Sequence, residues 1–216
     1  MTGGERTGGA TGDERTGGAT GAGGETRAPV GEAARLVRGF RPETDLERAV
    51  AQDPELLEGL AWGKPRRAHP EGAVGNHVAD LLARIDEDGE TGERRAQLRF
   101  VALVHDAFKS RVREWLPHSG WNHHANRARR FAERYTDDDR LLETIEQHDR
   151  PYNLWKKMRR RGRLDERAFQ TMLDRIPDHE LFMRFVEIDG SSEAKNPEPI
   201  AWFREQVERR GLVGER

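Results

Sequence analysis

The stretch RFVALVHDAFK, residues 99–109, is the most informative part of the sequence for the fold. An apolar run from Phe100 to Val104 leads directly into His105 and Asp106, and apolar side chains return immediately afterwards. Burying such a polar pair costs several kcal/mol unless a neighbouring side chain, a water or a metal ion satisfies it. The stretch therefore indicates both a core-facing segment and a candidate site within it.

Apolar residues recur at helical spacing on both sides of this stretch. The pair Asp53–Pro54 before a leucine-rich run is a helix start signal, and KPRRAHPEG at 64–72 is typical of a loop. The alternation of β-branched residues that marks strands is nearly absent, so the sequence predicts an all-α helical bundle. The predicted helices are about 30–37, one starting at 53, and then 74–86, 93–109, 122–135, 139–149, 165–176, 178–189 and 198–210.

The first 28 residues differ in composition from the rest of the chain. The block ERTGGATG occurs at 5–12 and again at 14–21, with almost no apolar side chain able to repay the entropy of ordering the chain. We therefore predict that residues 1–28 form a disordered Gly/Thr-rich tail. The total length of 216 residues then suits one helical domain over 29–212.

Composition and charge exclude several classes of protein. Charged residues make up 35% of the chain but the net charge is only −2, which argues against a general polyanion binder while leaving local patches open. There is no cysteine, so any metal must be held by His, Asp or Glu. No apolar run approaches ~18 residues and the N-terminus lacks the apolar core of a secretory signal, so we predict a soluble cytoplasmic protein without a membrane partner.

One basic run stands out against this balanced background. The segment KKMRRRGR occupies residues 156–163. We interpret it first as the solvated end of a helix, with a phosphate-facing or RNA-facing patch as the alternative.

Polar side chains interrupt the apolar faces of five predicted helices. Each lies at i, i+3, i+4 or i+7 from apolar neighbours, so it points toward the interior of the bundle. A single histidine on an apolar face is most often a satisfied core residue, but a set of them with aspartates is how helical bundles build metal centres. The set comprises His77, His105, Asp106, His124, His148 and Asp189.

The other histidines fit this pattern less well. His69 precedes a proline in the predicted loop, His118 lies in the turn LPHSGW, and His179 follows Asp178, a predicted helix cap. His123 is the direct neighbour of His124 and is an alternative to it.

The ordered set resembles the HD superfamily of metal-dependent phosphohydrolases over roughly residues 69–189. ALVHDAFK is similar to the apolar-HD-x-x-K signature of that family, with Lys109 in the lysine position. HPEGAVGNH, residues 69–77, is also locally similar to the opening of the HD domain of bacterial tRNA nucleotidyltransferases. The resemblance implies a helical bundle of the HD-domain type.

The resemblance also implies a ligand set. His77, His105, Asp106 and Asp189 would hold one divalent ion, and members with two additional histidines, here His124 and His148, often hold a second ion bridged by the central aspartate. Mixed nitrogen and oxygen ligation suits Mn, Fe, Co, Ni or Zn, and the order of affinities does not choose among them.

The implied activity is hydrolysis of a nucleotide or another small phosphate ester, as a phosphomonoesterase or phosphodiesterase, by metal-activated water. Asp106 would hold the metal, and Lys109, one helical turn beyond His105, is either a phosphate contact or a surface lysine. Ser191, Ser192 and Lys195 follow Asp189 and are capping or linker residues first, substrate contacts second. Two alternatives remain: a mixed-valent di-iron oxygenase with the same ligands, and a non-catalytic nucleotide- or RNA-binding module.

The tail offers a direct test of the domain boundary. Deleting residues 1–28 should leave the helix content and the thermal midpoint essentially unchanged, because these residues bury almost no apolar surface. Circular dichroism of the full chain and of the truncated chain measures both quantities. A clear drop in the midpoint would show that the tail packs on the domain.

Overall fold

The computed structural model describes residue 1 and residues 31–65, 72–191 and 195–214. Within these ranges every regular element is a helix, so the predicted all-α class is confirmed. The predicted tail, apart from Met1, lies outside the described residues. The helices are α1 (Glu32–Leu36), α2 (Asp45–Val50), α3 (Pro54–Ala61), α4 (Val74–Glu87), α5 (Gly92–Val104), the 3-10 helices η1 (Lys109–Arg111) and η2 (Gly120–Asn122), α6 (His124–Ala132), α7 (Asp139–Gln147), α8 (Arg150–Arg161), α9 (Glu166–Arg175), α10 (His179–Gly190) and α11 (Glu198–Glu208).

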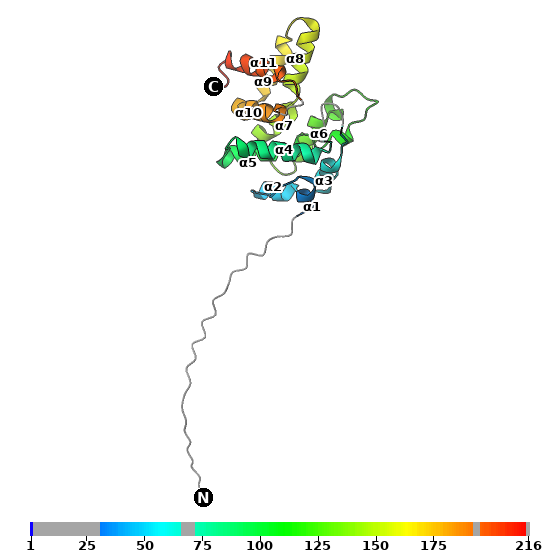
Figure 1. Cartoon of the computed structure of the whole chain (residues 1–216), viewed down its shortest axis with the longest axis vertical. Helices are drawn as coiled ribbons and strands as arrows, with labels where there is room; N and C mark the ends of the chain where they lie inside the picture. The colour runs from blue at the N-terminus through cyan, green and yellow to red at the C-terminus, as the bar shows by residue number, and fades with distance from the viewer. Residues whose placement is uncertain (2–30, 66–71, 192–194, 215–216) are drawn as a thin grey trace.

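The helices pack around two apolar cores that share α10. Figure 1 shows α1–α3 at one end of the domain, the α4–α5 pair above them, α10 next, and α8, α9 and α11 at the opposite end. Leu181, Phe185 and Ile188 of α10 belong to the larger core, which α1–α7 complete. Phe182 and Met183 face the smaller core, formed with α8, α9 and α11. Helix α10 therefore ties the two halves together.

A buried ion pair joins the N-terminal helices to α5. Arg99 and Glu47 are 3% and 0% exposed, and the guanidinium donates from Nε to Oε1 at 2.8 Å and from Nη2 to Oε2 at 3.1 Å. Nη2 also donates to the carbonyl oxygen of Arg41 at 2.9 Å. Breaking such a pair leaves an uncompensated buried charge, so this contact fixes α2 against α5. Helix α2 was not among the helices predicted from the sequence.

Helix α3 supports the backbone that follows α5. At Gly59, an added Cβ would lie 1.9 Å from the carbonyl oxygen of Ala107. No side chain fits at that distance, so the glycine allows α3 to pack directly on the turn that carries His105 and Asp106.

The predicted end of one helix was wrong, and one helix was predicted only at its basic end. The helix predicted over 93–109 ends at Val104, and the next residues form turns before η1. Helix α8, Arg150–Arg161, was not among the predicted helical ranges, but the interpretation of the basic run as the solvated end of a helix is confirmed, because α8 ends at Arg161. The basic run 156–163 covers its last turns, where Lys157 pairs with Asp165 at 2.8 Å and the guanidinium of Arg159 lies 5.8 Å from the centre of the Trp155 ring.

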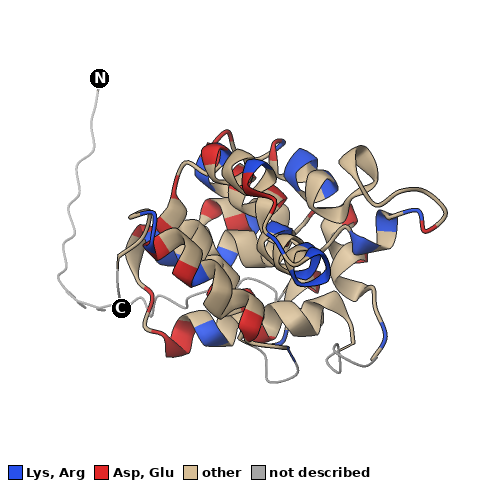
Figure 2. Ribbon diagram, turned by 90° about the horizontal axis from the view of Figure 1, so that it is seen from above, with Lys and Arg blue, Asp and Glu red and all other residues tan. Residues whose placement is uncertain are grey.

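The charged residues are mixed over the surface. Figure 2 shows Lys and Arg interspersed with Asp and Glu along most of the helices, as the small net charge leads one to expect. In the part of the chain that the structure describes, no helix combines the length and the apolar character needed to cross a bilayer.

The close approach at Gly59 generates a prediction about stability. Gly59→Ala should lower the free energy of unfolding by about 1–3 kcal/mol, because the backbone of the turn must move to accept the methyl group. Gly31→Ala is the matched control, since nothing lies within 4 Å of its added Cβ, and it should change stability by less than ~0.5 kcal/mol. Urea denaturation of both variants measures the difference. Equal stability of Gly59→Ala and the wild type would contradict the contact.

Candidate metal centre

His105 occupies the C-cap of α5 and its ring is locked there. Its Nδ1 lies 3.0 Å from the carbonyl oxygen of Ala102, one turn back along the helix. A carbonyl oxygen only accepts, so Nδ1 carries the proton and Nε2 presents a lone pair in the neutral ring. That Nε2 is fully buried and has no hydrogen-bond partner among the described residues. The cap therefore aims a free nitrogen lone pair into the interior.

His148 repeats this arrangement at the end of α7. It is the C-cap residue, and its Nδ1 lies 2.8 Å from the carbonyl oxygen of Ile145. Nε2 of the neutral ring is again the acceptor, and it too points inward. Like His105, His148 is followed by an aspartate, Asp149.

The carboxylate of Asp106 stands between two groups of histidines. Its Oδ2 lies 3.4 Å from Nε2 of His105 and 3.9 Å from Nε2 of His77. Its Oδ1 lies 3.4 Å from Nε2 of His124 and 3.6 Å from Nε2 of His148. Each oxygen therefore faces a different pair of imidazoles, and the side chain is only 7% exposed.

Asp189, near the end of α10, completes the first of these groups. Its Oδ1 lies 2.9 Å from Nε2 of His77 and 3.8 Å from Nε2 of His105. In the second group, Nε2 of His124 and Nε2 of His148 lie 3.3 Å apart. The structure thus brings together all six residues singled out from the sequence, from α4, the turn after α5, the start of α6, the end of α7 and α10.

The structure distinguishes His124 from its neighbour. His123 is the N-cap of α6, where its Nδ1 accepts from the backbone N–H of Ala125 at 3.3 Å. Its Nε2 lies 3.2 Å from Oδ2 of Asp149, whereas His124 faces Asp106. Asp149 was missed in the sequence, although a second His–Asp dipeptide at the end of a predicted helix was a visible signal.

Two lysines contact the carboxylates of the cluster. Lys109 donates from Nζ to Oδ2 of Asp106, and Lys195 donates from Nζ to Oδ1 of Asp189 at 3.0 Å. The prediction that Lys109 continues the helix of His105 was wrong, because α5 ends first and Lys109 begins η1. Ser191 donates to the carbonyl oxygen of Ile188 at 2.8 Å, a capping contact, and Ser192 lies outside the described residues.

Both carboxylates are strongly acidic. Burial raises the pKa of Asp106, but the charge of Lys109 and the proximity of His105 outweigh it and hold the pKa well below its ordinary value. At Asp189 burial likewise raises the pKa, but the charge of Lys195 and the hydrogen bond with His77 outweigh it and hold the pKa well below its ordinary value. The cluster therefore carries two ionised carboxylates at neutral pH.

The histidines divide into two kinds. Burial lowers the pKa of His105 and of His124 despite the nearby carboxylates, so both are neutral and able to bind a cation. Burial also disfavours the charged form of His148, but the contact with Asp106 and the charge of Asp149 outweigh it and raise its pKa to about 9. A cation bound at His148 would have to displace that proton.

The donor set fits a divalent metal. The nitrogen and oxygen atoms of His77, His105 and Asp106 lie within 4.8 Å of one another, and so do those of Asp106, His124 and His148. Nε2 of His105 and Oδ1 of Asp106 are buried atoms without a hydrogen-bond partner in the described chain, a costly state that a bound cation would relieve. A third group, His123, His124 and Asp149, meets the same distance limit.

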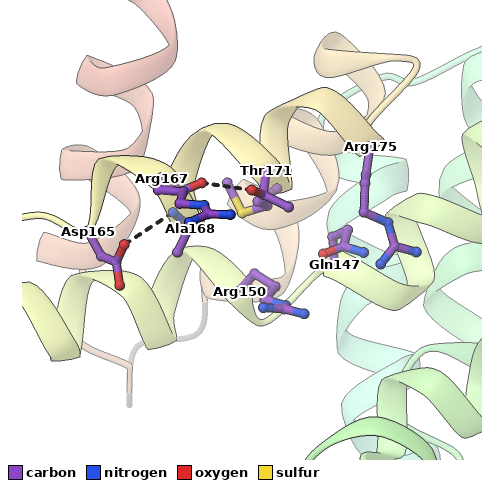
Figure 3. Close-up of a pocket in the computed structure, with 8 residues that line it drawn as sticks. Gln147, Arg150, Asp165, Arg167, Ala168, Thr171 and Arg175 are labelled. Atoms are coloured by element: carbon purple, nitrogen blue, oxygen red, sulfur yellow. Dashed lines mark hydrogen bonds between the residues drawn. The ribbon is translucent and has the colours of Figure 1, made fainter.

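A cavity lies beside this cluster without including it. It has a volume of about 360 Å³ and adjoins the end of α7 (Figure 3). None of the six residues lines it, although Gln147 does. Arg175, on its wall, binds Glu143 at 3.1 Å and Glu146 at 2.8 Å and so ties α9 to α7. The cavity therefore lies between α9 and α7, where Arg175 holds the helix whose C-cap is His148. The lining residues are Gln147, Arg150, Asp165, Arg167, Ala168, Thr171, Met172 and Arg175.

Comparison with protein families agrees with this geometry. The model of the HD domain matches residues 74–173, and the chain contains an HD domain over these residues. The match includes five of the six clustered side chains, while Asp189 lies beyond it. The local similarity to tRNA nucleotidyltransferases is not shown by this match. Neither the comparison with curated proteins nor the comparison with solved structures finds a match.

The two His–Asp dipeptides provide a matched test of metal binding. Adding Mn²⁺ at about 100 times its dissociation constant to metal-stripped protein should raise the thermal midpoint by about 5–10 °C. Asp106→Asn should abolish this rise, since the carboxylate lies at the centre of both groups. Asp149→Asn should retain it, because Asp149 faces His123 instead. Calorimetry measures all three midpoints. A loss in Asp149→Asn equal to that in Asp106→Asn would make Asp149 a ligand.

Proposed function

We propose that the protein is a metal-dependent phosphohydrolase that acts on a nucleotide or another small phosphate ester. The observation that carries the proposal is the carboxylate of Asp106, whose two oxygens face two separate pairs of buried imidazoles inside an HD domain. Such a donor set has no structural need of its own, because it leaves buried polar atoms unpaired.

In this proposal the ligands form two sets that share Asp106. His77, His105, Asp106 and Asp189 would hold one ion, and His124 and His148, together with Asp106, would hold a second. Nitrogen and oxygen donors without sulfur suit Mn, Fe, Co, Ni or Zn. Because α10 supplies Asp189, we also propose that the functional domain extends beyond the family match to cover 29–212.

A divalent cation in such a set lowers the pKa of a coordinated water toward ~7 and neutralises the charge of phosphate oxygens. The remaining groups are the protein's own. Lys109 keeps Asp106 ionised through its contact with Oδ2, and its ammonium group is a mobile point charge beside the cluster. We propose that it turns from Asp106 to a phosphate oxygen when substrate binds.

Lys195 holds Asp189 in place. Its Nζ donates both to Oδ1 and to the backbone carbonyl oxygen of that residue, at 3.0 and 2.6 Å. Two bonds to one residue make it a clamp on the end of α10. We therefore assign Lys195 a positioning role and Lys109 the contact with substrate.

Substitutions separate ligand from charge stabiliser. Asp106→Ala should lose both metal and phosphate release. Lys109→Ala should keep the metal and lose activity by ~10²-fold or more, the order seen when one preorganised electrostatic group is removed. His148→Ala should be milder than Asp106→Ala if one ion suffices for turnover. Elemental analysis and a phosphate-release assay over a panel of nucleotides measure both properties.

Lys157→Ala is the control, since Lys157 pairs with an aspartate of similar geometry on the surface of α8, and it should be fully active. An Asp106→Ala protein that retained metal and turnover would refute the proposal. The same six ligands also suit a di-iron oxygenase, so the assay is run under air and without it. Oxygen consumption with no phosphate release from any ester would assign that activity instead.

A further inference from the structure

A cluster of arginines lies around Trp121, in the segment that leads into α6. The guanidinium carbons of Arg113 and Arg127 lie 5.5 and 5.3 Å from the centre of the Trp121 ring. The Trp121 residue is 49% exposed, and Trp115 in the same segment is 79% exposed. Large aromatic side chains and cations are thus presented together to solvent.

The two arginines at Trp121 lack carboxylate partners in the described chain, whereas the nearby Arg111 binds Glu58. Among the described residues, neither Arg113 nor Arg127 forms an ion pair, and the Nε of Arg127 is buried without an acceptor. Burial, and then the charges of Arg113, Arg111 and Arg130, lower the pKa of Arg127. Like charges held together oppose folding. The cluster is therefore a feature that stability alone does not explain.

Another arginine of α6 is neutralised by carboxylates, unlike Arg127. Arg129, two residues along, binds Glu133 at 2.9 Å, Glu146 at 3.1 Å and also Glu143. The same helix thus carries one arginine surrounded by carboxylates and one surrounded by cations. The contrast indicates that the unbalanced charge around Trp121 is specific to that position.

The segment that carries the cluster is held firmly by one buried side chain. Asn122 is 2% exposed, and its amide oxygen accepts from the backbone N–H of Arg113 at 2.9 Å. Its Nδ2 donates to the carbonyl oxygens of Arg113 and Pro117 at 2.9 and 3.1 Å. These hydrogen bonds join Asn122 to the backbone of Arg113, nine residues earlier, and so hold Arg113 close to Trp121. A binding site arranged in advance in this way loses less entropy when its ligand binds.

The cluster adjoins the candidate metal centre along the chain. Arg127 lies three residues after His124 on α6, so both side chains are on neighbouring positions of one helix face. Arg113 follows Lys109 by four residues and lies two residues past η1, which ends at Arg111. If one group of a ligand bound at the metal centre, these arginines would be placed to contact the adjacent group of the same ligand.

We propose that Arg113, Arg127 and Trp121 bind a second phosphate group of the substrate, while the reacting phosphate lies at the metal centre. This rests on the proposed hydrolase function and narrows its substrate to a nucleoside polyphosphate. The planar guanidinium groups match phosphate oxygens in pairs, and a bound phosphate would balance the cluster. A nucleic acid strand would need a longer basic track, whereas the neighbouring Arg111 and Arg129 are bound to glutamates.

The test compares Arg113→Gln/Arg127→Gln with Arg159→Gln. Arg159 is the matched control because it lies 5.8 Å from the centre of Trp155 in the same kind of contact, on α8. Calorimetric titration of metal-stripped protein with inorganic tripolyphosphate should show affinity at least ~10-fold weaker in the double variant and unchanged in the control. In metal-loaded protein, KM for adenosine triphosphate should rise by a similar factor with kcat little changed, while KM for adenosine monophosphate changes less than ~2-fold.

Each outcome decides the proposal separately from the hydrolase function. Equal tripolyphosphate affinity in wild type and double variant overturns it, whether or not the enzyme releases phosphate. Loss of tripolyphosphate binding in a protein that hydrolyses no ester supports the phosphate site and refutes the hydrolase. If only binding of a 12-residue oligothymidylate weakens, the cluster serves a nucleic acid strand and the polyphosphate proposal fails. Circular dichroism should show the double variant folded, since the substitutions remove repulsion.

Discussion

The burial of the Asp106 carboxylate is the constraint on which the rest of the structure depends. A charge with a side-chain exposure of 7% must be compensated by every element around it. Helix α5 ends at Val104 so that the carboxylate can turn inward, and Gly59 of α3 leaves room for the backbone that makes this turn. Helices α4, α6, α7 and α10 then converge with three imidazoles and a second aspartate.

Helix ends, and not helix faces, set the precise direction of the key histidines. His105 and His148 both occupy C-caps, and both use Nδ1 to satisfy a carbonyl oxygen of the last turn. Those carbonyls would otherwise be unpaired. One contact thus caps the helix, fixes the tautomer and aims the second nitrogen. Local helix chemistry thereby supplies the rigidity that a metal site requires from its surroundings.

The sequence predicted much of this because inward-facing polar residues are a strong departure from the apolar pattern, and all six lie together. It did not predict where α5 ends, because the apolar pattern continues through Ala107 and Phe108, which are buried although the helix has already ended. Helix α2 has only six residues, too few for a periodic signal, and it is held by the Arg99–Glu47 pair from a distant part of the chain. Helix α8 is rich in arginine and buries only Pro151 and Leu154, so its sequence has no clear apolar periodicity from which to predict its full length. Asp149 was missed because its role depends on the orientation of His123.

The protein contains two kinds of buried charge, and comparing them separates structure from function. At Arg99 and Glu47 the ionic groups are paired through two hydrogen bonds, with a backbone carbonyl taking a third. Around Asp106 the hydrogen bonds are incomplete, because Nε2 of His105 and Oδ1 of Asp106 are buried without a hydrogen-bond partner among the described residues. Near Trp121 the described residues place no carboxylate on Arg127, and its Nε is likewise buried without an acceptor. A fold stabilised only for its own sake would satisfy the buried polar atoms at both places. The nitrogen and oxygen donors around Asp106 suit a cation, and Arg127, three residues after His124 on α6, suits an anionic group. A metal ion bound together with a polyanion would satisfy both places.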